Sequence, residues 1–414
     1  MINFDKFELD NGLQVVVHQD KTTSLAAFNL LYKVGSRDED PNRTGFAHLF
    51  EHLMFEGSVN IKDYDHQIQI AGGENNAFTN TDFTNYYITL PKQNLETAFW
   101  LESDRMLGLD FSEKKLEIQK NVVIEEFNQR YLNNPYGDWM LLIRGLAYHY
   151  HPYMWPTIGK NTFQIEHAKL HDVEEFFNHY YAPNNAILVV AGDVEVDEVK
   201  RLANKWFGPI PKRDIPARDL PIEPEQNIPQ TLIVKRNVPT NAIYKAYHMD
   251  GRLGPTYHTC NLISDILAGG DSSRLVQHLV KQQKTFVSIN AYITGETDPG
   301  LFLIEGKLND NISFEQAEES INAELKLLWS NDITDTELTK VKNNIEMRNI
   351  VGEVNVLNNA MNLARYTMLC DTNLINTNIA NYQKITLDDI KDTSSKIFAS
   401  HNCSTLLYKS SQKD

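Results

Sequence analysis

Residues 45–58, GFAHLFEHLMFEGS, place two histidines four positions apart, with a glutamate directly before the second. Apolar residues surround them on nearly every side of a helical projection, which predicts a buried helix. Positions three and four apart on a helix share one face, so His48, Glu51 and His52 should point the same way. Buried polar groups need partners, and one metal ion would serve all three.

Two imidazoles one helical turn apart can bind a single metal ion through ring nitrogens at about 2.1 Å. The structural alternative is a pair of core histidines bonded to backbone carbonyls, with Glu51 in a salt bridge. The order HxxEH is the reverse of the HExxH zinc-protease signature and favours the metal. A catalytic zinc usually has three protein ligands, so Glu51 is left as the general base and the third ligand must lie elsewhere.

A candidate third ligand lies in residues 116–132, LEIQKNVVIEEFNQRYL. Glu125 and Glu126 adjoin on a helix predicted over 113–132, about 100° apart around its axis, so only one of them can face the metal. A solvated pair of surface glutamates is the alternative interpretation.

The two segments together resemble the pitrilysin family of zinc endopeptidases, most closely its short branch, which includes the mitochondrial processing peptidase and bacterial relatives. GFAHLFEHLMFEGS and VVIEEF both match, and the resemblance covers essentially the whole chain. It implies one zinc ion per chain, bound by His48, His52 and Glu126. It also implies that Glu51 is the catalytic base and that Glu125 has a supporting role.

Residues 72–87, GGENNAFTNTDFTNYY, resemble the family's substrate-binding strand. The resemblance implies that Asn76, Ala77 and Phe78 contact the backbone of a peptide bound as an added β-strand, a mode that depends little on substrate sequence. An ordinary half-buried strand is the alternative. Seven residues before the implied third ligand the family often has a glutamate in the second shell, and this chain has Gln119, whose neutral amide can orient a ligand without adding charge.

The C-terminal half departs from the family pattern. Residues 267–293 resemble a segment whose arginine and tyrosine hold the substrate carbonyl, but in register this chain has Val280 and Val287. Valine cannot donate a hydrogen bond to a developing oxyanion. The resemblance therefore implies a heterodimer with a similar zinc-free subunit that supplies the Arg/Tyr clamp, with a homodimer as the alternative. Clam-like halves would then enclose short or unfolded peptides.

Six prolines within residues 209–229 predict a semi-rigid linker without helix or central strand. The segments on either side run through strands and helices in the same order, which predicts a duplicated α+β fold of two halves of about 200 residues. Each half is expected to be a mostly antiparallel sheet packed with helices. We predict a zinc-binding catalytic domain over 1–208, the linker over 209–229 and a non-catalytic domain over 230–414.

Local patterns predict several elements. Asn11-Gly12 between two β-type runs predicts a hairpin. The Thr-, Tyr- and Phe-rich residues 75–91 predict two strands or one long bent strand. Helices are predicted over 60–73, 92–107 and 113–132.

Composition narrows the class of partner. The chain has 414 residues and a formal charge of −16, which disfavours nucleic acid and anionic membranes as partners. Its three cysteines are far apart and odd in number, which disfavours a disulfide framework and a cysteine metal site. There is no signal-peptide pattern and no apolar run near the ~20 residues of a membrane helix, so the cytoplasm is expected, or the periplasm if a leader has been removed.

We expect a zinc metalloendopeptidase subunit, with a non-enzymatic scaffold of the same fold as the alternative.

Overall fold

The computed structural model describes residues 1–330 and 333–412. The chain packs into two compact units. Unit 1 contains Met1–Phe127, Trp155–Leu220 and Ile350–Thr377, and unit 2 contains Asn128–Met154, Pro221–Asn349 and Asn378–Asp414. Each unit therefore combines segments from both halves of the sequence.

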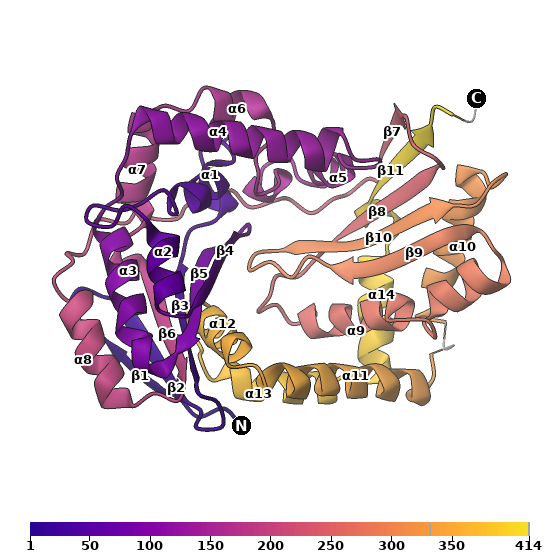
Figure 1. The fold of residues 1–414 in the computed structure, drawn as a ribbon. Coiled ribbons are helices and arrows are strands. Elements are labelled where there is room, and N and C mark those ends of the chain that lie inside the picture. The colour runs from indigo at the N-terminus through magenta and orange to yellow at the C-terminus, as the bar shows by residue number, and fades with distance from the viewer. Residues whose placement is uncertain (331–332, 413–414) are drawn as a thin grey trace. The chain divides into compact units, whose positions relative to one another are not determined.

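Unit 1 is built on a six-stranded sheet with the order β1-β2-β6-β3-β5-β4 (Figure 1). Its strands are β1 Asp5–Glu8, β2 Gln14–Gln19, β3 Leu25–Tyr32, β4 Glu74–Thr79, β5 Thr84–Pro91 and β6 Ala186–Gly192. Strands β2 and β6 run parallel, and every other neighbouring pair is antiparallel. Strand β4 lies at one edge, so one side of its backbone is not used by the sheet.

Two local predictions for this sheet are confirmed. Strands β1 and β2 form the hairpin expected around Asn11-Gly12. Gly12 has φ +86, and a Cβ there would come within 2.8 Å of the Cβ of Asn184, so the turn requires glycine. Residues 75–91 form two antiparallel strands, β4 and β5, rather than one bent strand.

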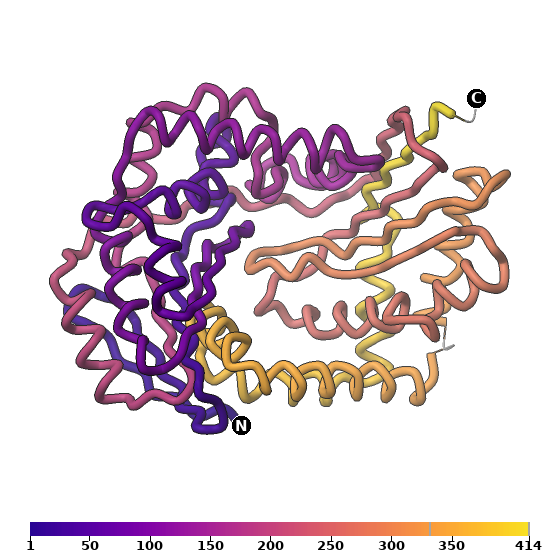
Figure 2. The backbone as a smooth tube through the Cα atoms, in the orientation of Figure 1, coloured from indigo at the N-terminus to yellow at the C-terminus, as the bar shows by residue number. Residues whose placement is uncertain are grey.

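Helices pack on both faces of this sheet. The helices of unit 1 are α1 Phe46–Leu53, α2 Tyr64–Ile70, α3 Leu95–Leu107, α4 Glu113–Phe127, α6 Thr162–Glu166, α7 Leu170–Tyr180, α8 Val196–Trp206 and α12 Val356–Met368. On one face Phe28 of β3 contacts Phe99 of α3 and lies near Phe207, just after α8. On the other face α12 packs Ala360 and Leu363 against the sheet, and Figure 2 shows this late segment beside the early strands.

Unit 2 has a five-stranded sheet with the order β7-β11-β8-β10-β9. Its strands are β7 Gln230–Arg236, β8 Ala242–Met249, β9 Phe286–Ile293, β10 Gly300–Leu308 and β11 Cys403–Ser410. Strands β7 and β11 are parallel and the remaining pairs antiparallel. This is the order and sense of β2-β6-β3-β5-β4, so the predicted α+β duplication is confirmed and β9 is the counterpart of the edge strand β4.

Helices also cover the two faces of the second sheet. Helix α5, Trp139–Ala147, lies on one face with Leu301 and Leu303 of β10. The opposite face packs against α9 Tyr257–Ala268, α10 Phe314–Leu327, α11 Asp335–Glu353 and α14 Leu387–Ile397. Helix α13 spans Leu374–Gln383.

Three helix predictions are confirmed with adjusted bounds. The helix predicted over 60–73 is the shorter α2, and that over 92–107 is a 3-10 turn, Lys92–Asn94, followed by α3. The helix over 113–132 is α4 continued by a π-helical turn, Asn128–Leu132.

The proline-rich residues 209–229 contain neither helix nor strand. Within the described residues, every helix is too short or too polar to cross a bilayer.

Candidate metal centre

Helix α1 separates its apolar and polar residues as the sequence predicts. Phe46, Leu49, Phe50 and Leu53 are at most 5% exposed. The Phe50 ring lies 4.2 Å from the ring centroid of Tyr181, which follows α7. With these side chains buried, His48, Glu51 and His52 remain on the partly exposed side of the helix.

A buried carboxylate holds the first turn of this helix. Glu39 accepts hydrogen bonds from the backbone N–H groups of Gly45 at 2.9 Å and Ala47 at 2.8 Å, and from Trp155 Nε1 at 3.1 Å. Burial raises the pKa of Glu39 to about 8, against the lowering effect of these three donated bonds. Gly45 has φ +87, and a Cβ there would come within 2.5 Å of the carbonyl oxygen of Ile158, so only glycine permits this helix start.

A buried cation holds the other end of α1. Arg105 of α3 is 1% exposed, forms an ion pair with Glu102 and donates to the carbonyl oxygen of Met54 at 3.4 Å. Its guanidinium lies over the rings of Tyr64 and Tyr86 at 4.1 and 4.7 Å. Both ends of the short helix are thus fixed by buried polar side chains from other elements, which sets the direction of its histidines.

Replacing Glu39 with alanine should therefore disturb the helix start. The Glu39→Ala variant leaves the buried amides of Gly45 and Ala47 without their acceptor, so we expect the free energy of unfolding to fall by about 1–3 kcal/mol. Zinc affinity should fall with it, because the histidines lose their orientation. Denaturant unfolding and a zinc titration measure the two effects. Glu39→Gln keeps an acceptor oxygen, so its free energy of unfolding should fall by less. Equal stability of Glu39→Ala and the parent chain would contradict this role of Glu39.

The structure brings His48, His52 and Glu126 together. The Nε2 atoms of His48 and His52 lie 3.6 and 3.7 Å from the same oxygen, Oε2 of Glu126. Donor atoms about 2.0–2.1 Å from one tetrahedral zinc would be roughly 3.4 Å apart, so both distances fit. The two imidazoles and the carboxylate all lie within 4.8 Å of one another, and no second cluster of three such donors occurs in residues 1–330 and 333–412.

Of the two adjacent glutamates on α4, only Glu126 lies with the histidines. Its side chain is 35% exposed, whereas Glu125 is on the exposed side of the helix. The choice between them depends on how α4 packs against α1.

Glu51 is held beside this donor cluster by the edge strand of the sheet. Thr79 Oγ1, at the end of β4, donates to Glu51 Oε2 at 2.6 Å, and the backbone N–H of Thr79 also bonds to this carboxylate. Burial raises the pKa of Glu51, the Thr79 hydrogen bonds oppose that rise, and the nearby charge of Glu126 adds to it. Thr79 was not singled out from the sequence, because only the packing of β4 on α1 reveals the contact.

Gln119, predicted to support the site, donates its side-chain amide to Glu56 Oε1. Glu56 follows His52 by four residues, just beyond the end of α1. The neutral amide is therefore paired with a carboxylate that sequence reasoning missed.

Asn76, Ala77 and Phe78 lie on the edge strand β4, as a substrate-binding strand requires. The N–H of Ala77 donates to the Oδ1 of Asn76 at 2.8 Å. Residues two apart on a strand direct their amides to the same side, so the N–H groups of Ala77 and Thr79 both point away from β5. Asn290 and Ala291 repeat this arrangement at 3.0 Å on the corresponding edge strand β9.

The two valines at the positions of the family's clamp lie in unit 2. Val280, in the π-helical segment Val276–Gln282, is packed partly against the hydrophobic core. Val287, on β9, is 54% exposed.

Comparison with known proteins identifies relatives over nearly the whole chain. Residues 14–135 match the family described as insulinase (peptidase family M16), and residues 167–345 match the peptidase M16 inactive domain. The chain is similar to a Helicobacter pylori protein named zinc protease PqqE, with 33% identity over 81% of this chain and 77% of that protein. It is also similar to the Bacillus subtilis protein named uncharacterized zinc protease YmxG, with 25% identity over 81% of each chain.

Solved structures show the same fold. A crystal structure of a protease from Helicobacter pylori has a TM-score of 0.94 and 29% identity, covering 99% of this chain and 100% of that one. A Pseudomonas fluorescens structure described as a peptidase M16 inactive domain has a TM-score of 0.87 at 17% identity, with coverage of 99% and 98%.

Proposed function

Because the chain belongs to peptidase family M16, the pitrilysin family of zinc proteases, we propose that it is a zinc metalloendopeptidase subunit that hydrolyses short or unfolded polypeptides. The observation that carries the proposal is the convergence of His48, His52 and Glu126 beside the buried carboxylate of Glu51. His48, His52 and Glu126 would bind one zinc ion. Zinc, when bound, supplies Lewis acidity that polarises a carbonyl and lowers the pKa of water.

Glu51 is the proton-transfer group in this proposal. As the oxygen of the attacking water bonds to the peptide carbonyl carbon, a proton passes from that water to Glu51. As the C–N bond breaks, Glu51 gives the proton to the departing amine nitrogen, so protons balance over the cycle. The Thr79 hydroxyl, which donates to Oε2, holds this carboxylate beside the donor cluster. Burial, which raises the pKa of Glu51, makes this carboxylate a stronger base.

We propose that the substrate adds to the edge strand β4 as a further strand, and Ala77→Pro tests this. Proline removes the N–H that points away from β5, so the sheet keeps its ladder while the bond to the substrate backbone is lost. We expect KM for peptides to rise about tenfold, the value of one hydrogen bond of about 1.4 kcal/mol, with kcat and Tm nearly unchanged. Ala77→Ser keeps the N–H and is the matched control. Unchanged KM in Ala77→Pro would place the substrate elsewhere.

A partner chain completes the proposed site. Val280 and Val287 cannot donate to an oxyanion, so we propose a heterodimer with a zinc-free chain of the same fold that supplies an arginine and a tyrosine; a homodimer is the alternative. In this arrangement residues 230–414 are the non-catalytic half. The part of the M16 inactive-domain match that falls within this half, residues 230–345, supports that assignment.

The function is tested by peptide cleavage with the purified chain, alone and mixed with a related chain that carries the arginine and tyrosine. We expect one zinc per chain, cleavage near background for the chain alone, a large increase with the partner, and loss of activity on chelation. Cleavage that persists without metal, or a chain that binds no zinc, would favour a non-enzymatic scaffold or another reaction. Full turnover by the chain alone would overturn only the heterodimer.

A further inference from the structure

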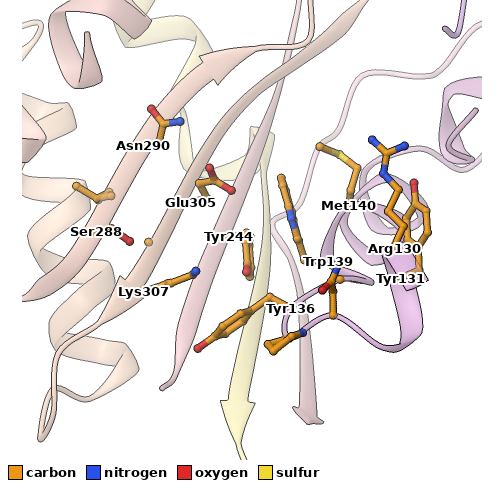
Figure 3. A pocket seen from close by; sticks show the side chains of 15 residues that line it. Arg130, Tyr131, Tyr136, Trp139, Met140, Tyr244, Ser288, Asn290, Glu305 and Lys307 are labelled. Carbon is orange, nitrogen blue, oxygen red and sulfur yellow. The ribbon is translucent and has the colours of Figure 1, made fainter. Parts of the chain in front are cut away.

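Unit 2 contains a cavity of about 600 Å³ that has no part in the proposed metal centre. It lies between the turn that leads into α5 and the strands β9 and β10 (Figure 3). Its lining includes Tyr136, Trp139, Tyr244, Asn290, Glu305 and Lys307. All of these residues belong to unit 2, so the cavity is formed within one compact unit.

Aromatic rings form much of the cavity wall and are held in place. Trp139, at the start of α5, stacks on Tyr244 of β8 with ring centroids 4.5 Å apart and planes 11° apart. The Tyr136 hydroxyl donates to the carbonyl oxygen of Thr240 at 2.8 Å and accepts from its N–H at 3.1 Å. The ammonium of Lys307 lies 4.8 Å from the centroid of the Tyr136 ring, so one wall of the cavity already interacts with a cation.

Glu305 is the only carboxylate among the residues that line the cavity. It is half-buried on the face of β10 that also carries Leu301 and Leu303. Asn290 Oδ1 accepts the N–H of Ala291 at 3.0 Å, which orients its amide group to donate to Glu305. Burial raises the pKa of Glu305, while the Asn290 bond and the charge of Lys307 act in the opposite direction.

Among the described residues Glu305 forms no ion pair within 4.0 Å, and the charge of Lys307, two residues along the same strand, acts on it from farther away. Figure 3 shows the Arg130 guanidinium on the other side of the Trp139 ring from this carboxylate. A half-buried carboxylate without an ion-pair partner is costly, and a cation from outside would offset that cost. Aromatic faces next to a carboxylate are also the surroundings in which ammonium and guanidinium groups bind.

We propose that this cavity binds the cationic group of a peptide, either a lysine or arginine side chain or an amino terminus, between Glu305 and the Trp139 and Tyr244 rings. Binding of such a group needs neither zinc nor turnover. Its role in choosing substrates rests on the proposed peptidase function, for which it would be a recognition site separate from the donors of unit 1.

Calorimetric titration of the full chain with small probes tests the proposal. Nα-acetyl-arginine amide and Nα-acetyl-lysine amide represent side chains, alanine amide represents an amino terminus, and Nα-acetyl-norleucine amide is the neutral control. We expect at least one cationic probe to bind saturably and the norleucine probe to bind at least tenfold more weakly. Binding of the arginine or lysine probe would indicate a site for a side chain, and binding of alanine amide would indicate a site for an amino terminus. Equal affinity of the cationic and neutral probes would overturn the proposal.

Two substitutions with opposite expected effects locate the binding. Glu305→Gln keeps the shape of the side chain and should lower the affinity for the cationic probe about tenfold or more. Lys307→Gln removes the competing ammonium and should raise this affinity, an effect that misfolding cannot imitate. Glu319→Gln, which removes the same charge from an exposed position on α10, is the matched control and should change nothing. Unchanged affinity in Glu305→Gln would overturn the site. Because no step requires hydrolysis, this result is independent of the peptidase test.

Discussion

Replacing Glu51 with glutamine is expected to lower kcat for peptide cleavage by about 10²–10⁴-fold, the usual contribution of a general base. Glutamine has nearly the same shape and can still accept the Thr79 hydroxyl through its amide oxygen, but it cannot accept a proton from water. Zinc content should stay at one per chain, because the donor cluster consists of the other three side chains. Peptide turnover by the assembled enzyme and metal analysis measure the two quantities.

Glu113→Gln is the control for this experiment, since it removes the same charge from an exposed position at the start of α4. It should leave kcat unchanged. If Glu51→Gln cleaves peptides at the parent rate, another group is the base. If it loses zinc as well as activity, Glu51 belongs to the ligand set.

Replacing Glu126 with alanine is expected to remove both zinc and activity. Two histidines on one helix then remain, and the carboxylate oxygen that lies 3.6 and 3.7 Å from their Nε2 atoms is gone. Loss of a supporting group alone costs about 10–100-fold in metal affinity, so loss of a ligand should exceed about 100-fold. Metal analysis and a competitive zinc titration check this result.

Glu125→Ala is the matched variant, because it makes the same change one residue away on the exposed side of α4. It should keep zinc and most activity. The reverse outcome, zinc loss in Glu125→Ala and zinc retention in Glu126→Ala, would exchange the two assignments. Loss in both variants would point to damage to α4 rather than to a ligand.

Features that depend on neighbouring residues in the chain were predictable from the sequence. The spacing of His48, Glu51 and His52 places them on one side of a helix because helical geometry is local. The same holds for the hairpin at Asn11-Gly12, where the turn needs a positive φ. The matching order of elements in the two halves also allowed the duplicated fold to be predicted.

Contacts between distant segments were not predictable from the residues alone. A pattern of helix positions leaves Glu125 and Glu126 as alternatives, and only the packing of α4 on α1 brings Glu126 to the histidines. Glu39 and Thr79 orient the site from a loop and from an edge strand, and neither lies in a motif. Helix α12 packs on the sheet of unit 1 although it comes from the C-terminal half of the chain.

The type of metal donor, its helical spacing and the duplicated α+β fold follow from backbone geometry over a few residues or from repeated order, so the amino-acid sequence is enough to predict them. Three features depend instead on the folded chain: which carboxylate joins the histidines, what holds both ends of α1, and where Glu305 meets an aromatic wall. These contacts join segments tens of residues apart, and side-chain directions across such an interface are set only when both elements are in place.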